Sequence, residues 1–217
     1  MGGPDLTPPY ARFLGRLIRP FPNWDPFFIK PLRQRALRTL ELKEGSRVLD
    51  AGCGAGGSFP YLVEAVGTTG EVVGVEISPE MATNARRRVE ANGWKNIHVI
   101  VGDARSMRLS GVFDGLVMFA APDVYASEEA ISNLLPHLKE GGRIVLFGAK
   151  LSQHGAGVML NIVFRALMKL SFSSTPKLSH EPWAVLKNRL VDVQVREYFF
   201  GCMFLAWGSL KHRVSEG

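Results

Sequence analysis

A cluster of glycines between an apolar run and a helical pattern constrains the fold of this chain more than any other feature. The segment VLDAGCGAGGS, residues 48–58, holds four glycines in six consecutive positions. The apolar run at 46–51 before it has the character of a buried strand, and apolar residues after it recur at helical spacing over 59–66. Because glycine permits tight turns and close approach to the backbone, the segment predicts a strand, a tight turn and a helix.

Strands and helices continue to alternate as far as residue 148. Further strands are predicted at 71–77, 97–101, 113–119 and 143–148. The tripeptide Ser78-Pro79-Glu80 has the composition of a helix start, and Met81, Ala85 and Val89 form the expected inner stripe of that helix. Ser127 is expected to cap another helix, which Pro136 kinks or ends. Gly141-Gly142 is then expected to turn the chain into the strand at 143–148.

The pattern changes after residue 150. Helices are predicted at 158–170 and 182–190, followed by strands at 191–199 and 202–209 that are joined through Phe200-Gly201. So short a link requires antiparallel strands. The sequence therefore predicts an α/β fold: a doubly wound, mostly parallel seven-stranded sheet with a C-terminal antiparallel hairpin and an N-terminal helical extension. We expect one domain, with the extension at 1–44, a core at 45–150, and a substrate lid with the terminal strands at 151–217.

Cysteine content and hydropathy limit the cellular setting. The 217 residues include only two cysteines, which favours a reducing compartment and gives no reason to expect a disulfide framework or a zinc site. The N-terminus lacks the basic and apolar regions of a signal peptide. The most apolar stretches, 157–168 and 198–208, are too short to span a bilayer. We therefore expect a cytoplasmic protein.

The glycine cluster fits two nucleotide-binding patterns. Gly52, Gly54 and Gly57 match the G-x-G-x-x-G of a dinucleotide site. The same loop, read from Asp50 through Gly56, matches the D-x-G-x-G-x-G of a site for S-adenosylmethionine (SAM). Glu76 follows Gly57 by 19 residues, where a carboxylate can accept both hydroxyls of an adenosine ribose in either case.

Three features favour SAM over a dinucleotide. Asp50 places a carboxylate where SAM carries a cationic amino group, and a dinucleotide needs none there. Asp103 ends the third strand and suits the exocyclic amine of adenine. The closing antiparallel hairpin is the third feature, because dinucleotide domains usually end in parallel strands.

At this point the chain resembles the class I SAM-dependent methyltransferases. The segments VLDAGCGAG, VVGVEIS, VGDA, FDGLVMF and LKEGGRIVLFG stand in the order and spacing of that family, over about residues 45–150. The resemblance implies SAM as cofactor, S-adenosylhomocysteine (SAH) as product and no metal. The cofactor-binding residues that it implies are Asp50, Ala51, Gly52, Cys53, Gly54, Gly56, Glu76, Ile77, Asp103, Ala104 and Phe119.

The resemblance also implies a role for each part of that set. Residues 50–54 hold the methionine end of SAM, with Cys53 packed under the loop. Glu76 takes the ribose hydroxyls and Ile77 lies against the adenine. Asp103 with Ala104 reads the adenine edge, and Phe119 with the next residue lies under the sulfonium. No catalytic residue is assigned, since the candidates at the strand ends, Asp123, Tyr125 and His154, are more often without such a role.

The two ends of the chain indicate which kind of molecule accepts the methyl group. The net charge is +4 over residues 1–44, −3 over 45–148 and +5 over 149–217. Segments 10–20 and 158–172 combine apolar residues with basic ones, as in surfaces that rest on anionic bilayers. The terminal YFFGCMFLAWGS also loosely resembles that of the quinone C-methyltransferases. We therefore expect a lipophilic acceptor, quinone-like or a lipid, reached by reversible contact with the inner membrane surface.

Other functions stay open at this stage. The acceptor could be small and water-soluble, or the chain could be a nicotinamide-dependent oxidoreductase or a non-catalytic SAM-binding partner protein. The segment FAAPD, residues 119–123, differs from the N-P-P-[YF] motif of methylases that act on base or glutamine amines. No nucleic-acid partner is therefore expected.

Overall fold

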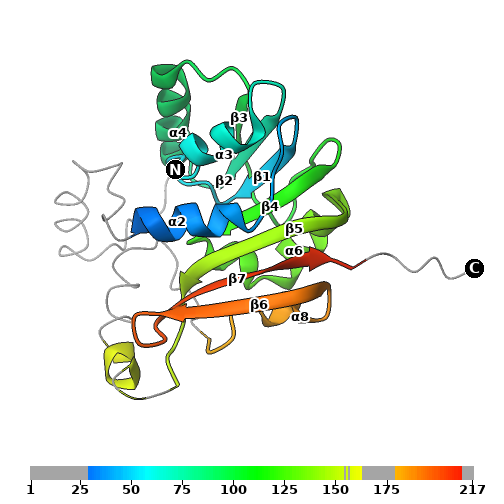
Figure 1. The fold of residues 1–217 in the computed structure, drawn as a ribbon. Coiled ribbons are helices and arrows are strands. Elements are labelled where there is room, and N and C mark those ends of the chain that lie inside the picture. Colours follow the sequence, from blue (N-terminus) through cyan, green and yellow to red (C-terminus); the bar gives the residue numbers. More distant parts are fainter. Residues whose placement is uncertain (1–28, 154, 156, 163–178, 212–217) are drawn as a thin grey trace, which may run out of the picture.

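The computed structural model describes residues 29–153, 155, 157–162 and 179–211, and their strands form one seven-stranded sheet (Figure 1). The strand order is β3-β2-β1-β4-β5-β7-β6. β1 to β5 pair in parallel, and β7 runs antiparallel to both β5 and β6. The strands are β1 (Arg47–Ala51), β2 (Glu71–Glu76), β3 (Ile97–Val101), β4 (Phe113–Phe119), β5 (Leu138–Ala149), β6 (Leu190–Tyr198) and β7 (Met203–Leu210). The predicted fold class, including the terminal hairpin, is confirmed.

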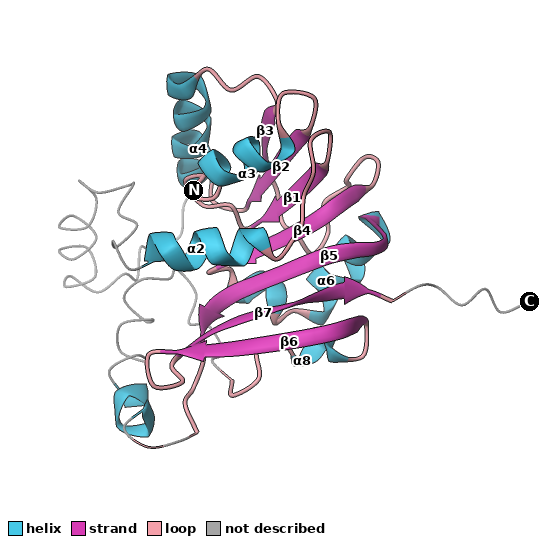
Figure 2. Ribbon diagram, in the orientation of Figure 1, coloured by secondary structure: helices cyan, strands magenta, loops and turns pink. Residues whose placement is uncertain are grey.

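Helices cover both faces of the sheet (Figure 2). One face carries α2 (Ile29–Arg38), α3 (Phe59–Val66) and α4 (Pro79–Asn92). The other carries α5 (Pro122–Tyr125), α6 (Glu128–Leu134), the 3₁₀ turn η1 (Leu135–His137) and α8 (Ala184–Lys187). Each face has its own apolar core: Phe59, Leu62 and Val66 of α3 are buried in one, and Ile131 and Leu134 of α6 in the other. This two-layer coverage leaves the ends of the strands as the place for a site.

The helix α4 begins and ends where the sequence predicts, and of the predicted inner stripe Ala85 is buried and Val89 packs against the core, but Met81 does not. The Ser78 hydroxyl caps the helix by accepting from the Met81 N–H at 3.4 Å, and Gly93 ends it in the left-handed region with φ of 67°. The buried residues are Ala82 and Ala85, whereas Met81 is 39% exposed. The prediction of Met81 in the inner stripe is therefore wrong. A Cβ at Gly54 would lie 3.7 Å from the Met81 Cε, so this side chain lies beside the glycine loop.

The strand β5 is longer than predicted. It begins at Leu138, directly after the 3₁₀ turn that contains Pro136, so that proline does end the preceding helix. The expected turn at Gly141-Gly142 lies inside the strand. At these glycines the pairing of β5 with β4 shifts register, opposite Phe113–Gly115, and Gly141 has φ of 70°. The glycines thus make an irregularity within a strand rather than a turn before one.

Two sequence predictions extend beyond the described residues. The amphipathic segment 10–20 lies outside them, and of the predicted helix at 158–170 the structure describes 158–162, which belong to a helical turn at 157–162. The predicted helix at 182–190 is shorter, with α8 at Ala184–Lys187. Among the helices that the structure describes, none combines the length and apolar character needed to cross a membrane.

Candidate cofactor-binding site

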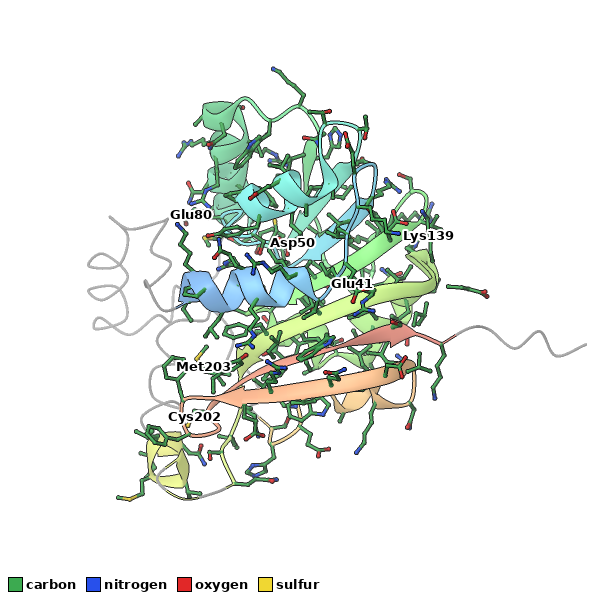
Figure 3. All side chains as sticks on the ribbon, in the orientation of Figure 1. Glu41, Asp50, Glu80, Lys139, Cys202 and Met203 are labelled. Atoms are coloured by element: carbon green, nitrogen blue, oxygen red, sulfur yellow. The ribbon has the colours of Figure 1, made fainter. Side chains whose placement is uncertain are left out.

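The candidate site lies at the carboxyl ends of the parallel strands, around the glycine loop that follows β1. Parallel pairing places Ala51 opposite Val75, so the loop begins beside the end of β2, where Glu76 lies. Glu76 in turn lies opposite Val101 of β3, two residues before Asp103. In Figure 3 the labelled Asp50 lies at this end of β1, close to α2. The structure thus brings the three predicted acidic residues to one edge of the sheet.

Two glycines of the loop are required by the packing around them. Gly52 has φ of 81°, and a Cβ there would lie 2.5 Å from the Ala121 Cβ. Gly56 has φ of 77°, and a Cβ there would lie 2.5 Å from the Phe59 ring. Real Cβ atoms do not come so close, and L side chains rarely adopt this φ. The loop therefore folds tightly against β4 and α3 only because these positions are glycine.

Most backbone N–H groups of the loop are used within the protein. The Gly52 and Cys53 amides donate to the Val75 carbonyl at 2.8 and 3.0 Å, and the Gly56 amide donates to the Cys53 carbonyl at 2.9 Å. The Gly54 amide donates to a Glu76 carboxylate oxygen at 2.9 Å. A pyrophosphate is held by several backbone N–H groups that point outward, and most of the N–H groups here are already used. This geometry disfavours a dinucleotide, in agreement with the choice of SAM made from the sequence.

Glu76 both organises the loop and offers acceptors to a ligand. Its Oε2 accepts from Gly54 and its Oε1 accepts from the Ser78 amide, each at 2.9 Å. The residue is 9% exposed. A carboxylate has about four lone-pair sites, so two remain after these bonds. That number suits the two hydroxyls of a ribose, and the assignment to the ribose stays a prediction.

Asp50 is a buried carboxylate with the Arg33 guanidinium and the Ser58 hydroxyl nearby, and neither of them forms a hydrogen bond of ordinary geometry with it. The residue is 1% exposed, and among the described residues neither carboxylate oxygen has a hydrogen-bond partner. Burial raises the pKa of Asp50 to about 7, the nearby Arg33 guanidinium opposes this rise, and the Glu76 charge adds to it. A buried polar group without a partner costs free energy, which a cationic ligand group would recover. The residues present therefore fit the ammonium group of SAM.

Arg33 is a site residue that the sequence reasoning missed. Its guanidinium lies 3.9 Å from the centroid of the Phe119 ring, and its Nη1 donates to the Ser58 hydroxyl at 2.9 Å. A Cβ at Gly57 would lie 3.1 Å from the same guanidinium. Arg33 lies near Asp50, so a cation and a carboxylate stand side by side at the glycine loop. Such a pair is complementary to the zwitterionic amino-acid end of SAM.

The end of β4 forms the floor beside this pair. Phe119 is buried and stacks on Phe147 of β5 with ring centroids 4.4 Å apart. Ala120, directly after it, is exposed and has φ of 55°. A non-glycine residue in the left-handed region is uncommon and marks a backbone held by its surroundings. The predicted contact of Phe119 with the sulfonium is not tested by this geometry and stays a prediction.

The predicted adenine-reading residues are in place, but Asp103 already has a partner. The Arg105 guanidinium binds both of its carboxylate oxygens at 2.6–2.9 Å, and the Arg105 amide donates to Oδ1 at 2.9 Å. These bonds from Arg105 hold the pKa of Asp103 below its usual range. Ile77 is 58% exposed at the same edge, whereas Ala104 is buried. A ligand at Asp103 would therefore share its carboxylate with Arg105, and the assignment of Asp103 to the adenine amine stays a prediction.

Replacing Asp103 with asparagine tests the adenine assignment. The amide keeps an acceptor oxygen but adds a competing donor and removes the charge. A hydrogen bond to a charged group is worth about 1 kcal/mol more than a neutral one, or about fivefold in affinity. We expect Asp103→Asn to weaken SAH at least about fivefold more than an SAH analogue that lacks the adenine amine. Equal losses for both ligands in calorimetry would show that Asp103 does not read that edge.

Cys53 and the candidate catalytic residues show no sign of a reactive environment in the described part of the chain. Cys53 is buried, and this burial raises the pKa of its thiol, so the thiol stays protonated. Tyr125 is buried too, its ring packs edge-on against Phe204, and burial raises its pKa. Neither is suited to act as a base. Asp123 lies exposed on α5, and His154 lies outside the described residues.

Comparison with known proteins gives the same class. A family model described as a methyltransferase domain matches residues 48–142. Protein-L-isoaspartate O-methyltransferase 2 of Archaeoglobus fulgidus is 37% identical over 109 residues, 49% of this chain and 47% of that protein. Demethylmenaquinone methyltransferase of Staphylococcus saprophyticus is 33% identical over 121 residues, 54% of this chain and 50% of that protein. The chain thus spans about half the length of the curated relatives it matches.

A solved structure extends the likeness to the whole fold. The SAM-dependent methyltransferase from Aquifex aeolicus superposes with a TM-score of 0.62 at 20% identity, over 95% of this chain and 100% of that one. At this identity the likeness concerns the fold alone. The seven-stranded sheet with its antiparallel β7 is consistent with the Rossmann-like fold of such methyltransferases. Residues 48–142 of this chain match a methyltransferase domain, and the fold is that of a SAM-dependent methyltransferase.

Proposed function

We propose that this chain transfers the methyl group of SAM to a lipophilic acceptor, quinone-like or a lipid, at the carboxyl edge of its sheet. The observation that carries the cofactor part is the buried Asp50 carboxylate, whose oxygens accept no hydrogen bond of ordinary geometry from the described residues and which lies beside Arg33. Together these two charges complement an amino-acid zwitterion. Glu76 completes the arrangement on the neighbouring strand.

The protein residues in this proposal bind and orient rather than react. SAM, when bound, supplies a methyl group that is already activated. Asp50 holds the ammonium group, Arg33 the carboxylate and Glu76 the ribose hydroxyls, so that the methyl group is fixed in direction. Alignment of two reactants and exclusion of water are then the main tasks left to the chain.

Support for a lipophilic acceptor comes from the names of two relatives and from exposed residues outside the matched core. Two relatives at similar identity are named demethylmenaquinone methyltransferase and aklanonic acid methyltransferase, the latter 34% identical over 54% of this chain. The isoaspartate methyltransferase of Archaeoglobus fulgidus matches equally well over a similar share, so the matched half does not select the acceptor. Exposed apolar residues follow the ends of β5 and β6, on the side of the sheet where the cofactor site lies. Met159, Ile162 and Phe200 are among them. We further infer reversible contact with the inner membrane surface.

A methyl-transfer assay with two acceptor pools tests this proposal. The full chain and SAM with a tritiated methyl group are incubated with a lipid extract that contains demethylated quinones, or with an isoaspartyl peptide. We expect label in the organic phase and none in the peptide. Label in the peptide alone would overturn the lipophilic acceptor, and binding of NADH but not SAH in a thermal-shift assay would overturn the cofactor.

A further inference from the structure

The helical turn 157–162 and the β6–β7 turn lie side by side. Both are on the side of the sheet where the parallel strands end and the cofactor site lies. The Ser152 hydroxyl donates to the Phe200 carbonyl at 2.7 Å, and the Cys202 thiol donates to the Gly157 carbonyl at 3.6 Å. These bonds hold the helical turn 157–162 against the β6–β7 turn, and Figure 1 shows the two together beyond the tip of β5. We name their exposed apolar side chains the apolar tip: Val158, Met159, Ile162, Phe199 and Phe200.

The apolar tip is exposed, its own residues are uncharged, and the Glu197 carboxylate beside the β6–β7 turn forms an ion pair with Lys150. Met159 is 79% exposed, Ile162 77% and Phe200 72%. The segments 151–162 and 198–210 contain no Lys, Arg, Asp or Glu. Single exposed apolar residues are ordinary, but a contiguous group of them marks an interaction surface.

The backbone of the β6–β7 turn adds an independent observation. Phe199 has φ of 51° and Phe200 φ of 57°, followed by Gly201 at 80°. The left-handed region is disfavoured for bulky side chains, and glycine or asparagine would make this turn with less strain. Folding alone therefore does not favour an aromatic residue at position 200, where its side chain is also mostly exposed. Its presence fits a role for that side chain at an interface.

We propose that the apolar tip inserts into the surface of a bilayer that contains anionic lipid. This inference rests on the proposed function, whose acceptor it would bring to the site. Residues 163–178 follow the tip directly in the sequence and hold Arg165, Lys169 and Lys177 but no acidic residue. Uncharged apolar residues that are followed in the sequence by basic ones are typical of interfacial membrane anchors.

The position of the tip supports a lipid surface as the partner. β6 and β7 share the sheet with β1, with β4 and β5 between them. At about 4.8 Å per strand spacing, the end of β6 lies roughly 19 Å from the end of β1. Insertion of the tip would therefore turn the edge that contains Asp50 toward the headgroups (Figure 3).

Vesicle binding by the full chain tests the proposal. We compare co-sedimentation with vesicles of phosphatidylcholine and 30% phosphatidylglycerol for the wild type, Phe200→Asn and the control Val112→Asn. Val112 is 47% exposed in the loop before β4, at the opposite edge of the sheet. We expect Phe200→Asn to lower vesicle partitioning about tenfold with an equal or higher Tm, and Val112→Asn to bind as the wild type does.

Several results would overturn the proposal. These are no vesicle binding by the wild type, equal binding by Phe200→Asn, or a wild-type dimer in sedimentation velocity that Phe200→Asn dissociates, which would make the tip an interface between copies. SAH calorimetry on each protein separates this inference from the proposed function. A chain that binds vesicles but not SAH contradicts the proposed function, whereas one that binds SAH but not vesicles contradicts the membrane contact only.

Discussion

Replacement of Glu76 by alanine is expected to weaken SAH binding by about 10- to 150-fold. Each charge-assisted hydrogen bond to a ribose hydroxyl is worth roughly 1.5–3 kcal/mol, and 1.4 kcal/mol is tenfold in affinity. Glu76 also accepts from the Gly54 and Ser78 amides, so its loss removes one of the hydrogen bonds that hold the glycine loop against β2. Both effects act in the same direction. Isothermal titration calorimetry on the folded variant measures the loss.

Glu76→Gln separates the two contributions. Glutamine keeps one acceptor oxygen, but its amide group opposes one of the two backbone N–H donors. We expect an intermediate loss of SAH affinity for this variant. Glu71→Gln is a matched control, because Glu71 belongs to the same strand and forms an ion pair with Arg47 at the other end of the sheet. Unchanged SAH affinity in a folded Glu76→Ala protein would refute the ribose assignment.

Sequence patterns predicted the frame of the site because its determinants are local. The apolar run, the glycines and the Ser78 cap each specify a strand, a turn or a helix start within a few residues. Parallel strands then bring Asp50, Glu76 and Asp103 to one edge without further information. For this reason the mostly parallel sheet with its terminal hairpin, and the place of the three acidic residues, could be predicted from the chain alone.

What sequence patterns missed depends on contacts between distant segments. Arg33 reaches the loop through a hydrogen bond to Ser58, 25 residues away, and no spacing rule connects them. Met81 fits a helical stripe, but the orientation of α4 on the sheet turns it toward the loop. Arg105 lies two residues from Asp103, yet their pairing depends on side-chain rotamers that the sequence does not specify. Tertiary packing decides each of these cases.

The affinity for SAH is expected to fall about 20- to 30-fold between pH 7.5 and pH 5.5, because Asp50 must be ionised to hold the ammonium group. With a pKa of about 7 in the ligand-free protein, roughly three quarters of the Asp50 carboxyls are charged at pH 7.5 and about 3% at pH 5.5. The apparent affinity scales with the charged fraction. Binding at pH 6 should also release close to one proton, which calorimetry in two buffers of different ionisation enthalpy detects.

The raised pKa of Asp50 also contributes to the pH dependence of the free energy of unfolding in the ligand-free protein. The pKa of Asp50 is raised above its value in the unfolded chain, so the folded state holds more protons between about pH 4 and pH 7. The contribution of Asp50 to the free energy of unfolding is therefore complete below this window and is lost as the pH rises through it. The slope is at most about 1.4 kcal/mol per pH unit. Saturating SAH should oppose this loss.

Asp50→Asn is the variant that decides whether Asp50 is responsible, because asparagine keeps the shape of the side chain and cannot ionise. We expect weaker SAH binding at pH 7.5 and a nearly flat dependence on pH, with no proton released. Asp114→Asn is the control: burial favours a higher pKa there, but hydrogen bonds from the Arg47 amide and Lys139 hold the pKa of Asp114 below its usual range. This control should therefore keep the wild-type profile. If Asp50→Asn instead retained the full fall in affinity between pH 7.5 and 5.5, another group would be titrating and the ammonium assignment would be wrong.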